Sequence, residues 1–527
     1  MGTFKDVERE EMEHFEEHLA TVEAAKKKES TDVTMDVEPT NESVAELTNR
    51  DAEWRKALRA SMKPKERTAI ERVKMPELDP VYRATTRTEE VNIGLTKEMA
   101  LTEAKRCLDC PKPSCMEGCP VNINIPSFVK NIERGQFLAA AKVLKNTSAL
   151  PAVCGRVCPQ EKQCESRCVH LKMNKPAVAI GYLERFAADY ERQSGNISIP
   201  EKDPANGIKV AVVGSGPAGL SFAGDMAKKG FDVTVFEALH EIGGVLKYGI
   251  PEFRLPNAIV DVEIENLQKM GVKFVADCIV GKTIGVKELE KQGFKGIFVA
   301  SGAGLPNFMN IPGENALNIM SSNEYLTRVN LMDAANPHTD TPINLGKNVV
   351  VVGGGNTAMD SCRTAKRLGA NVTLVYRRSE AEMPARLEEV KHAKEEGITF
   401  LTLHNPKEYE ADEKGAVKSV ILDVMQLGEP DASGRRRPEA TGETIKLECD
   451  QVIVAVGVSP NPLVPQSIEG LELGRKNTIA VNEQMQSSQP AIYAGGDIVR
   501  GGATVILAMG DGRKAALNMA QQLKPEA

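Results

Sequence analysis

The stretch Lys209–Glu237, KVAVVGSGPAGLSFAGDMAKKGFDVTVFE, determines the fold expected for most of the chain. It begins with the apolar run Val210–Val213, which is typical of a buried strand, and it breaks at Gly214, Gly216 and Gly219 with G-x-G-x-x-G spacing. A segment of helical period and a second β run follow. This order predicts a βαβ unit whose glycine turn admits a pyrophosphate to the N-terminus of a helix.

The end of this unit indicates which dinucleotide it binds. Glu237 follows the second strand, where a carboxylate accepts a hydrogen bond from the free ribose 2′-OH of FAD or NAD. Pro217 and Ala218 lie inside the turn and are expected contacts as well. Two plainer interpretations stay open: a glycine turn in an α/β domain that binds nothing, and Glu237 as a solvated loop acid.

A second unit of the same design begins at Lys347 and reads KNVVVVGGGNTAMDSCRTAKRLGANVTLVYRR. Its turn has the G-x-G-x-x-A variant, and its second strand ends in two arginines instead of an acid. Guanidinium groups bind a 2′-phosphate through charge-assisted hydrogen bonds, so this unit is predicted to bind NADPH. A solvated arginine pair at a strand end is the alternative. The expected contacts are Gly353, Gly355, Asn356, Thr357, Ala358, Arg377 and Arg378.

Other small-residue stretches are expected to complete the first site. In HEIGGVLKYGIPEFRLP, two glycines admit a planar ring close to the backbone, whereas His240 is expected to be structural. Near the C-terminus, a helix that starts at Thr504 can face a phosphate or the flavin ring, and Asp497 can accept from a ribityl hydroxyl. The expected contacts here are Gly243, Gly244, Arg254, Ala455, Gly457, Gly496, Asp497 and Thr504.

Eight of the eleven cysteines fall between Cys107 and Cys168, in the runs C-x2-C-x4-C-x3-C-P and C-x3-C-P-x4-C-x3-C. Such clustering in a chain that is not exported indicates metal or iron–sulfur ligation. Zinc is the alternative, but the two Cys-Pro pairs and the single nearby histidine, His170, favour two iron–sulfur clusters. The isolated cysteines, expected to be core thiols, are Cys278, Cys362 and Cys449.

Length and composition narrow the class of protein. A chain of 527 residues needs several domains, and a net charge of -7 disfavours nucleic acid. No apolar run reaches the length of a membrane span and the start lacks a signal-peptide pattern, so we expect a cytoplasmic protein without a membrane partner. The expected fold is α/β, with a helical N-terminal domain for two [4Fe–4S] clusters before two nested Rossmann-like domains. The divisions are a charged extension and connector (1–90), the iron–sulfur domain (91–195), an FAD domain in two parts (207–345 and 455–525) and an NADPH domain (346–454).

Several local predictions accompany these divisions. Helical spacing in the extension indicates either packed helices or a mobile segment with transient helices. It occurs at Phe15, Leu19 and Val22, and again at Trp54, Ala57, Leu58 and Met62. We further expect an extended connector at Lys74–Arg83, a helix N-cap at Thr96, a helical segment over Ile125–Leu144, a closing helix over Gly181–Tyr190 and a solvated loop tip at Arg435–Arg437.

In combination, the motifs resemble flavoproteins with two dinucleotide-binding domains, and more narrowly the small (β) subunit of NADPH-dependent glutamate synthase. Relatives of that subunit include the N-terminal half of dihydropyrimidine dehydrogenase and the large subunit of NADH-dependent ferredoxin:NADP oxidoreductase. The resemblance covers residues 75–525 and implies FAD in the first unit, NADPH in the second, and two [4Fe–4S] clusters. It rests on CLDCPKPSCMEGCP, CGRVCPQEKQCESRC, VVGSGPAGL, EIGGVLKYGIPEFRLP, VVGGGNTAMD and YAGGDIVRGGATV in this order.

The resemblance also implies two interleaved sets of cluster ligands. The first set would be Cys107, Cys110, Cys115 and Cys168. The second set would be Cys119, Cys158, Cys164 and Glu184, which leaves Cys154 spare. A surface position for Glu184 is the alternative.

The resemblance implies hydride transfer from NADPH to the flavin and single-electron transfer to the clusters, so no catalytic acid–base residue is expected. The chain has no counterpart of the amidotransferase nucleophile or FMN barrel, so electrons would pass to a large partner subunit. Two other functions stay open. One is a stand-alone or bifurcating reductase, or the electron-input part of a dihydropyrimidine dehydrogenase, with ferredoxin among the possible acceptors. The other is a redox-sensing module with structural clusters. We expect the chain to form an oligomer.

Overall fold

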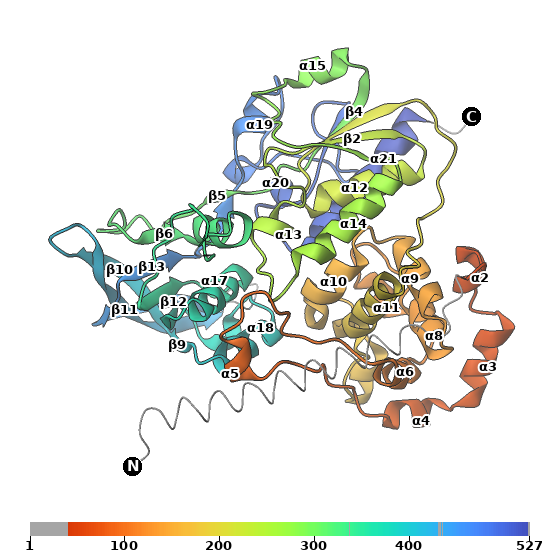
Figure 1. Cartoon of the computed structure of the whole chain (residues 1–527), viewed down its shortest axis with the longest axis horizontal. Helices are drawn as coiled ribbons and strands as arrows, with labels where there is room; N and C mark the ends of the chain where they lie inside the picture. Colours follow the sequence, from red (N-terminus) through yellow and green to blue (C-terminus); the bar gives the residue numbers. More distant parts are fainter. Residues whose placement is uncertain (1–39, 337, 431–433, 435, 525–527) are drawn as a thin grey trace.

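The computed structural model describes residues 40–336, 338–430, 434 and 436–524. The predicted helix through Phe15, Leu19 and Val22 lies outside these residues. Figure 1 shows a helical part beside two α/β parts, with α2 (Val44–Thr48), α3 (Glu53–Ser61) and α4 (Pro64–Ala69) along the outer side of the helical part. Within the described residues, no helix is both long and apolar enough to cross a membrane.

The first α/β part contains a parallel five-stranded sheet in the order β15-β4-β1-β2-β3. Its central strand β1 is a valine-rich run that is buried from Val210 to Val213, as expected for a strand covered on both faces of a parallel sheet. Strand β15 comes from the C-terminal end of the chain, so two distant segments build one sheet. The elements are β1 Lys209–Val213, α12 Pro217–Lys228, β2 Asp232–Phe236, α13 Val245–Tyr248, α14 Asn257–Lys269, β3 Lys273–Val275, α15 Val286–Lys291, β4 Phe294–Val299, α19 Leu463–Gln466, β15 Ile492–Ala494, α20 Asp497–Arg500 and α21 Val505–Leu523.

The second α/β part lies between these segments and repeats the design. Its parallel sheet has the order β6-β13-β7-β8-β9, and the short antiparallel pair β5 Leu305–Pro306 and β14 Val458–Ser459 lies where the chain enters and leaves it. The elements are β6 Ile319–Ser321, α16 Ser322–Leu326, β7 Asn348–Val352, α17 Asn356–Arg367, β8 Asn371–Tyr376, α18 Leu387–Glu395, β9 Thr399–Thr402 and β13 Gln451–Val454.

An antiparallel three-stranded sheet extends from this part. It is formed by β10 His404–Ala411, β11 Val417–Pro430 and β12 Arg436–Glu448. The prediction of a solvated loop tip at Arg435–Arg437 is therefore wrong for Arg436 and Arg437, which open a long strand. Ladder bonds to β11 and an ion pair of 3.0 Å between Arg436 and Glu382 stabilise that strand despite its polar sequence.

The helical part follows the expected start. Thr96 caps α6, because its Oγ1 accepts from the backbone N of Met99 at 3.3 Å. The single helical segment expected at Ile125–Leu144 is instead two helices, since Gly135 adopts a φ of +79° and ends the first of them. The elements are α6 Lys97–Lys105, α7 Ser114–Glu117, α8 Ile125–Glu133, α9 Phe137–Lys145, α10 Pro151–Val157, the 3₁₀ turns Gln160–Lys162, Glu165–Arg167 and Val169–Met173, and α11 Ile180–Ser194.

The described part of the N-terminal extension, from residue 40 onward, contains packed short helices. Trp54, on the predicted helix, stacks under the guanidinium of Arg134 at 4.0 Å. The connector is not extended throughout: Asp79 caps the backbone N–H groups of Val81 and Tyr82, and Pro80 at the first helical position favours one helical turn. The elements are α2 Val44–Thr48, α3 Glu53–Ser61, α4 Pro64–Ala69 and α5 Pro80–Arg83.

Candidate dinucleotide and iron–sulfur sites

The glycine turn of the first α/β part is organised around a buried carboxylate. Glu237 is 6% exposed, and its Oε2 accepts from the backbone N (2.8 Å) and Oγ (2.6 Å) of Ser215. Ser215 Oγ in turn accepts from the backbone N of Gly243 at 2.9 Å. Glu237 is therefore not a solvated loop acid, because it fixes the turn against the segment that precedes α13.

The glycines of this turn have different physical roles. Gly214 has a φ of +102°, and a Cβ on it would lie 2.5 Å from the carbonyl oxygen of Ala300. A Cβ on Gly219 would lie 2.0 Å from the carbonyl oxygen of Gly214. A Cβ on Gly216 would meet no described atom within 4 Å. The open space beside Gly216, at the start of α12, fits a pyrophosphate lying against the backbone.

One cavity of about 650 Å³ reaches all three parts of the chain. Its walls include Glu237, Asn356 at the start of α17, and Val157 at the end of α10. The volume is in the range of ligand-binding pockets. The predicted contacts that line it are Gly214, Gly216, Pro217, Ala218, Glu237, Gly244, Arg254, Asn356, Thr357, Gly496, Asp497 and Thr504.

The remaining predicted contacts lie outside this lining. They are Gly219, Gly243, Gly353, Gly355, Ala358, Arg377, Arg378, Ala455 and Gly457. Gly353 packs tightly, since a Cβ there would lie 2.4 Å from the carbonyl oxygen of Ala455. Arg377 is exposed, and Arg378 donates from Nε to the carbonyl oxygen of Arg436 at 3.2 Å. Both arginines follow β8 beside β7, so they flank the turn that begins at Gly353.

The start of α17 joins the two dinucleotide units. Asn356 Oδ1 accepts from the backbone N of Arg386 at 2.9 Å. Arg254, predicted as a cofactor contact, lines the cavity, but its Nη1 donates to both carboxylate oxygens of Asp360 at 2.7 and 2.8 Å. Burial raises the pKa of Asp360 to about 6, and the Arg254 charge opposes that rise. Arg254 therefore connects the first unit to α17 across the cavity wall.

Another part of the cavity lining comes from the C-terminal helices α20 and α21. Thr504 is the N-cap of the 19-residue α21 and accepts from the backbone N of Leu507 at 3.4 Å. Gln163 of the helical part donates to Thr504 Oγ1 at 3.5 Å. Asp497 begins α20, and burial raises the pKa of its carboxyl to about 6. The wall thus offers a helix N-terminus and an acid in the positions predicted for a phosphate and a ribityl chain.

The first cysteine set lies around a smaller cavity. Cys107, Cys110, Cys115 and Cys168 all line it, from two separate segments of the chain. Burial raises the pKa of Cys107 to about 11 and also raises the pKa of Cys115. Thiols that resist ionisation on their own become ligands when a metal supplies positive charge, so this donor set fits an iron–sulfur cluster.

The second set includes a buried carboxylate. Glu184 on α11 is 5% exposed, and its Oε1 has no hydrogen-bond partner among the described residues. Burial, followed by the charge of Glu263, raises its pKa to about 8. Burial raises the pKa of the thiols of Cys119 and Cys164, and the carboxylate of Glu184 raises it further. The pKa of the Cys158 thiol is raised first by its hydrogen bond with Cys154, then by burial, and further by Glu184. The surface alternative for Glu184 is therefore wrong, and the four groups fit a cluster with one oxygen ligand.

The other four cysteines are buried, and one of them, Cys154, is hydrogen-bonded to Cys158 of the second set. Cys154 is fully buried, and its Sγ lies 3.4 Å from the Sδ of Met509 on α21. The three isolated cysteines are buried, as expected for core thiols: Cys278, Cys362 and Cys449. Cys278 also lines the large cavity.

Sequence reasoning missed three residues of these sites. Ser215 stands between two loop glycines, at a position where the G-x-G-x-x-G pattern specifies no residue type. Asp360 lies one helical turn after Asn356 on α17, where a carboxylate is unremarkable until Arg254 is placed against it. Asp109 lies between two ligand cysteines and is fully buried, and its position in CLDC was the available signal.

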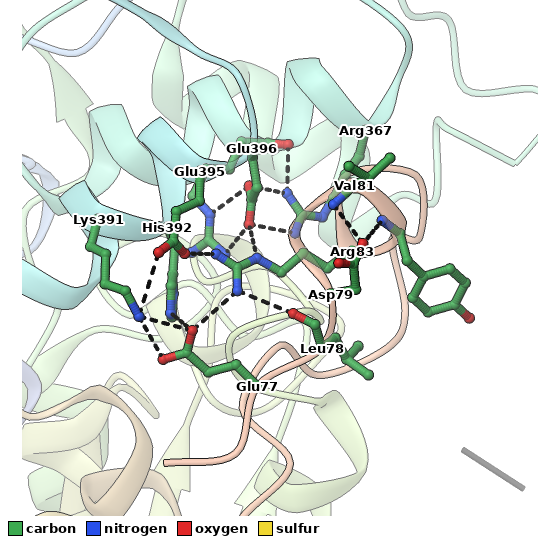
Figure 2. Close-up of polar contacts among 12 residues, drawn as sticks. Glu77, Leu78, Asp79, Val81, Arg83, Arg367, Lys391, His392, Glu395 and Glu396 are labelled. Atoms are coloured by element: carbon green, nitrogen blue, oxygen red, sulfur yellow. Dashed lines mark hydrogen bonds and ion pairs between the residues drawn. The ribbon is translucent and has the colours of Figure 1, made fainter. Parts of the chain in front are cut away.

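One further group of potential ligands lies outside the cavities. Figure 2 shows Glu77, His392 and Glu395 side by side, close enough to share an ion. Lys391 and Arg83 already pair with these carboxylates at 2.5–3.6 Å. Because the two cations already neutralise the acids, we assign no metal to this group.

The comparisons with known proteins agree with this geometry. Residues 208–512 match the pyridine nucleotide-disulphide oxidoreductases, and residues 83–196 match the 4Fe–4S cluster domain described as dihydropyrimidine dehydrogenase domain II. Together the matches and the sites define the class: an oxidoreductase that uses FAD, NADPH and [4Fe–4S] clusters.

Within this class, the chain belongs to the glutamate synthase small-chain family. The "Glutamate synthase [NADPH] small chain" of Azospirillum brasilense is 35% identical over 452 residues, which is 84% of this chain and 93% of the relative. The "NADP(+)-dependent formate dehydrogenase subunit beta" of Moorella thermoacetica is 37% identical over 437 residues, 78% of this chain and 60% of that relative. The solved structure of Mycobacterium tuberculosis FprA in complex with NADPH has a TM-score of 0.51 at 20% identity, covering 60% of this chain and 85% of that one, which shows the shared fold.

Proposed function

We propose that this chain is the electron-input subunit of a glutamate synthase. It would take electrons from NADPH and deliver them, through FAD and two [4Fe–4S] clusters, to a large subunit that makes L-glutamate from glutamine and 2-oxoglutarate. The observation that carries the proposal is the single cavity shared by three parts of the chain. Asn356 reaches it from the second unit, Glu237 from the first, and Val157, next to Cys158, from the helical part.

Each wall of the cavity has its own task in this proposal. When bound, the nicotinamide and flavin supply hydride transfer and the clusters supply one-electron transfer. Ser215 and Glu237 would hold the adenosine end of FAD, while the backbone at Gly216 and the helix start at Thr504 would hold its phosphates. Asn356 and Thr357 direct the nicotinamide toward the flavin. Apolar side chains such as Val157 exclude water from the space between them.

The two arginines after β8 give the proposal its nucleotide preference. Arg377 and Arg378 would bind the 2′-phosphate that distinguishes NADPH from NADH. Anaerobic titration of the reconstituted protein should bleach the flavin with NADPH and far less with NADH. Arg377→Ala and Arg378→Ala should raise KM for NADPH with little effect on NADH. Arg437→Ala, at an exposed arginine on β12, is the matched control.

The same titration separates the proposed electron path from a sensing module. A flavin that is not bleached by NADPH refutes the electron-input function. Clusters that stay oxidised after the flavin is reduced would indicate a structural or sensing role for them.

A second candidate function is a reductase for another acceptor protein. It is favoured by the similar identity to a formate dehydrogenase β subunit, which is named for different chemistry. The coverage favours glutamate synthase, because the chain spans 93% of that small chain and only 60% of the β subunit. The deciding experiment mixes the reduced protein with a purified glutamate synthase large chain and measures glutamate formed per NADPH oxidised. Ferredoxin serves as the competing acceptor.

A further inference from the structure

The loop that carries Cys107 and Cys110 is built around a buried aspartate. Asp109 has a φ of +51°, in the left-handed region, and its side chain is 0% exposed. Its Oδ1 lies 2.6 Å from Nη2 of Arg55, and its Oδ2 lies 3.0 Å from Nε of Arg55 and 2.7 Å from Nη1 of Arg59. Two guanidinium groups from α3 therefore hold one carboxylate that stands between two ligand cysteines.

Two backbone carbonyl groups of this loop also accept hydrogen bonds from basic side chains. Arg50, just before α3, donates from Nη2 and Nε to the carbonyl oxygen of Asp109 at 3.0 and 3.3 Å. Lys130 on α8 donates from Nζ to the carbonyl oxygen of Cys107 at 2.7 Å. Both carbonyl groups belong to the loop that presents the cysteine sulfurs, so these bonds restrict its conformation.

The N-terminal helices are anchored independently of the aspartate. Arg55 is 2% exposed and also donates to Ser127 Oγ on α8 at 2.8 Å. Leu47 on α2 is fully buried, and its carbonyl oxygen accepts from Asn131 Nδ2 at 3.3 Å. Arg55 and α2 are therefore attached to α8 by contacts that do not involve Asp109.

The charges in this group are unbalanced. Arg50, Arg55 and Arg59 carry three positive charges, and Asp109 carries one negative charge beside thiols that become anionic ligands. An unpaired carboxylate there would repel an anionic cluster, whereas the excess cations attract it. The reduction potential of an iron–sulfur cluster depends on nearby charge and hydrogen bonds, so this field favours the reduced state.

We propose that α2 and α3 form a clamp, defined here as Arg50, Arg55 and Arg59, which positions the Cys107–Cys110 loop through Asp109 and raises the reduction potential of the cluster bound there. The clamp lies outside both family matches, which begin at residues 83 and 208. The inference rests on the proposed first ligand set. It gives the N-terminal extension a function in electron transfer, through positioning residues that do not touch the cluster.

The test uses the full chain reconstituted with FAD and iron–sulfur clusters under anaerobic conditions. Arg55→Met and Arg59→Met remove one charge each, and Arg59→Lys keeps the charge. Lys56→Met is the matched control, because Lys56 lies on the same helix with a half-exposed side chain and pairs only with Glu53 among the described residues. The readouts are iron per chain, the rate of bleaching by a chelator, and an EPR-monitored redox titration of the two clusters.

We expect one cluster to titrate at a more negative potential in Arg55→Met and Arg59→Met, and to lose iron to the chelator faster than in wild type. The other cluster should be unchanged. Arg59→Lys should restore the potential in part, and Lys56→Met should match wild type. Asp109→Asn combined with Arg55→Met should change the potential by less than the sum of the single changes, because the two residues act as a pair.

Wild-type potentials and chelator rates in both arginine variants would overturn the proposal, as would equal effects from Lys56→Met. If Arg55→Met does not fold, Arg59→Met alone tests the proposal. The Arg59 side chain is 23% exposed and that of Arg55 only 3%, so its replacement should disturb the fold less. If the proposed function is wrong, the result is a different one: NADPH does not bleach the flavin of the wild-type protein.

Discussion

Arg83 and Glu396 are 313 positions apart in the sequence, and the Nε of Arg83 lies 3.1 Å from Oε1 of Glu396 in a fully buried ion pair. Figure 2 shows this carboxylate held from the other side by Arg367. Arg363 also pairs with it, at 2.7 Å. Charged side chains thus fix the connector from the N-terminal extension to the second α/β part.

Arg83→Met should therefore destabilise the protein. Removing Arg83 breaks a buried ion pair, but Arg363 and Arg367 still compensate Glu396, so the cost should be about 3 kcal/mol, at the lower end of the range for a broken buried pair. Chemical denaturation monitored by circular dichroism should show this loss as a lower midpoint. Lys391→Met is the matched control, because Lys391 pairs with the same connector through Glu77 while 53% exposed, and should cost less than about 1 kcal/mol. An equal loss of stability in the two variants would contradict a stabilising role for the buried ion pair between Arg83 and Glu396.

The same network predicts a pH dependence of stability. Burial disfavours the charge on Glu396, but Arg363 and Arg367 outweigh it and lower its pKa to about 2. A folded-state pKa below the unfolded value stabilises the protein above the unfolded pKa, and this stability is lost as the pH falls from about 4.5 toward 2. For Glu396 the contribution is of the order of 3 kcal/mol.

The measurement compares wild type with Glu396→Gln by thermal unfolding between neutral and acidic pH. The wild type should lose more stability than the variant below about pH 5, since the amide does not titrate. Glu389 and Glu77, whose pKa values are also about 2, titrate in both proteins and cancel in the comparison. Parallel pH profiles would show that Glu396 contributes nothing through its charge.

The sequence predicted the parts of the fold that repeat a local pattern. The valine runs, glycine turns and strand-end residues Glu237 and Arg377 follow fixed spacings that the backbone geometry of a βαβ unit requires. The cap at Thr96 is likewise a property of a few adjacent residues. Such features can be predicted without knowing which distant residues contact each other in the fold.

What the sequence did not predict depends on pairs far apart in the chain. The strand at Arg436 exists because β11 pairs with it, although its own residues are polar. The partners of Asp109 and Arg254 come from α3 and α17, and no spacing rule joins a charge to a partner that distant. A glycine at position 135 is a local signal for a helix end, but the residues on both sides have helical spacing, which favours one continuous helix.

Gly216→Ala should weaken FAD binding without disturbing the fold. A Cβ at this position meets no described atom, and its φ of −67° is allowed for alanine, so the polypeptide tolerates the methyl group. The same methyl group would enter the space assigned to the pyrophosphate. We expect FAD affinity to fall about tenfold or more, or about 1.4 kcal/mol, in a fluorescence titration.

The control for this glycine is Gly285→Ala. Gly285 also has open space around it and a negative φ of −89°, but it precedes α15 and does not line the cavity. It should bind FAD as wild type does and have a similar melting temperature. Loss of FAD in Gly285→Ala, or normal binding in Gly216→Ala, would place the pyrophosphate elsewhere.

Glu184→Gln and Cys154→Ala test which residue completes the second cluster. Glu184 brings an unpaired buried oxygen to the thiols of Cys119, Cys158 and Cys164. Cys154 is hydrogen-bonded to Cys158, and its Sγ also lies 3.4 Å from the Sδ of Met509. A neutral amide is a poor iron ligand, so Glu184→Gln should lose about half of the bound iron, that of one cluster of the two. Cys154→Ala should keep both clusters and cost about 1 kcal/mol of stability for the lost sulfur.

Iron and sulfide analysis of the reconstituted variants, with EPR of the reduced protein, distinguishes the two residues. Retention of one cluster signal with the other absent in Glu184→Gln assigns the oxygen ligand. If Cys154→Ala loses the cluster instead, the thiol has replaced the carboxylate, and Cys154 must rotate away from Met509 when iron binds. In that case Glu184 would be a buried acid whose raised pKa keeps it protonated near neutral pH.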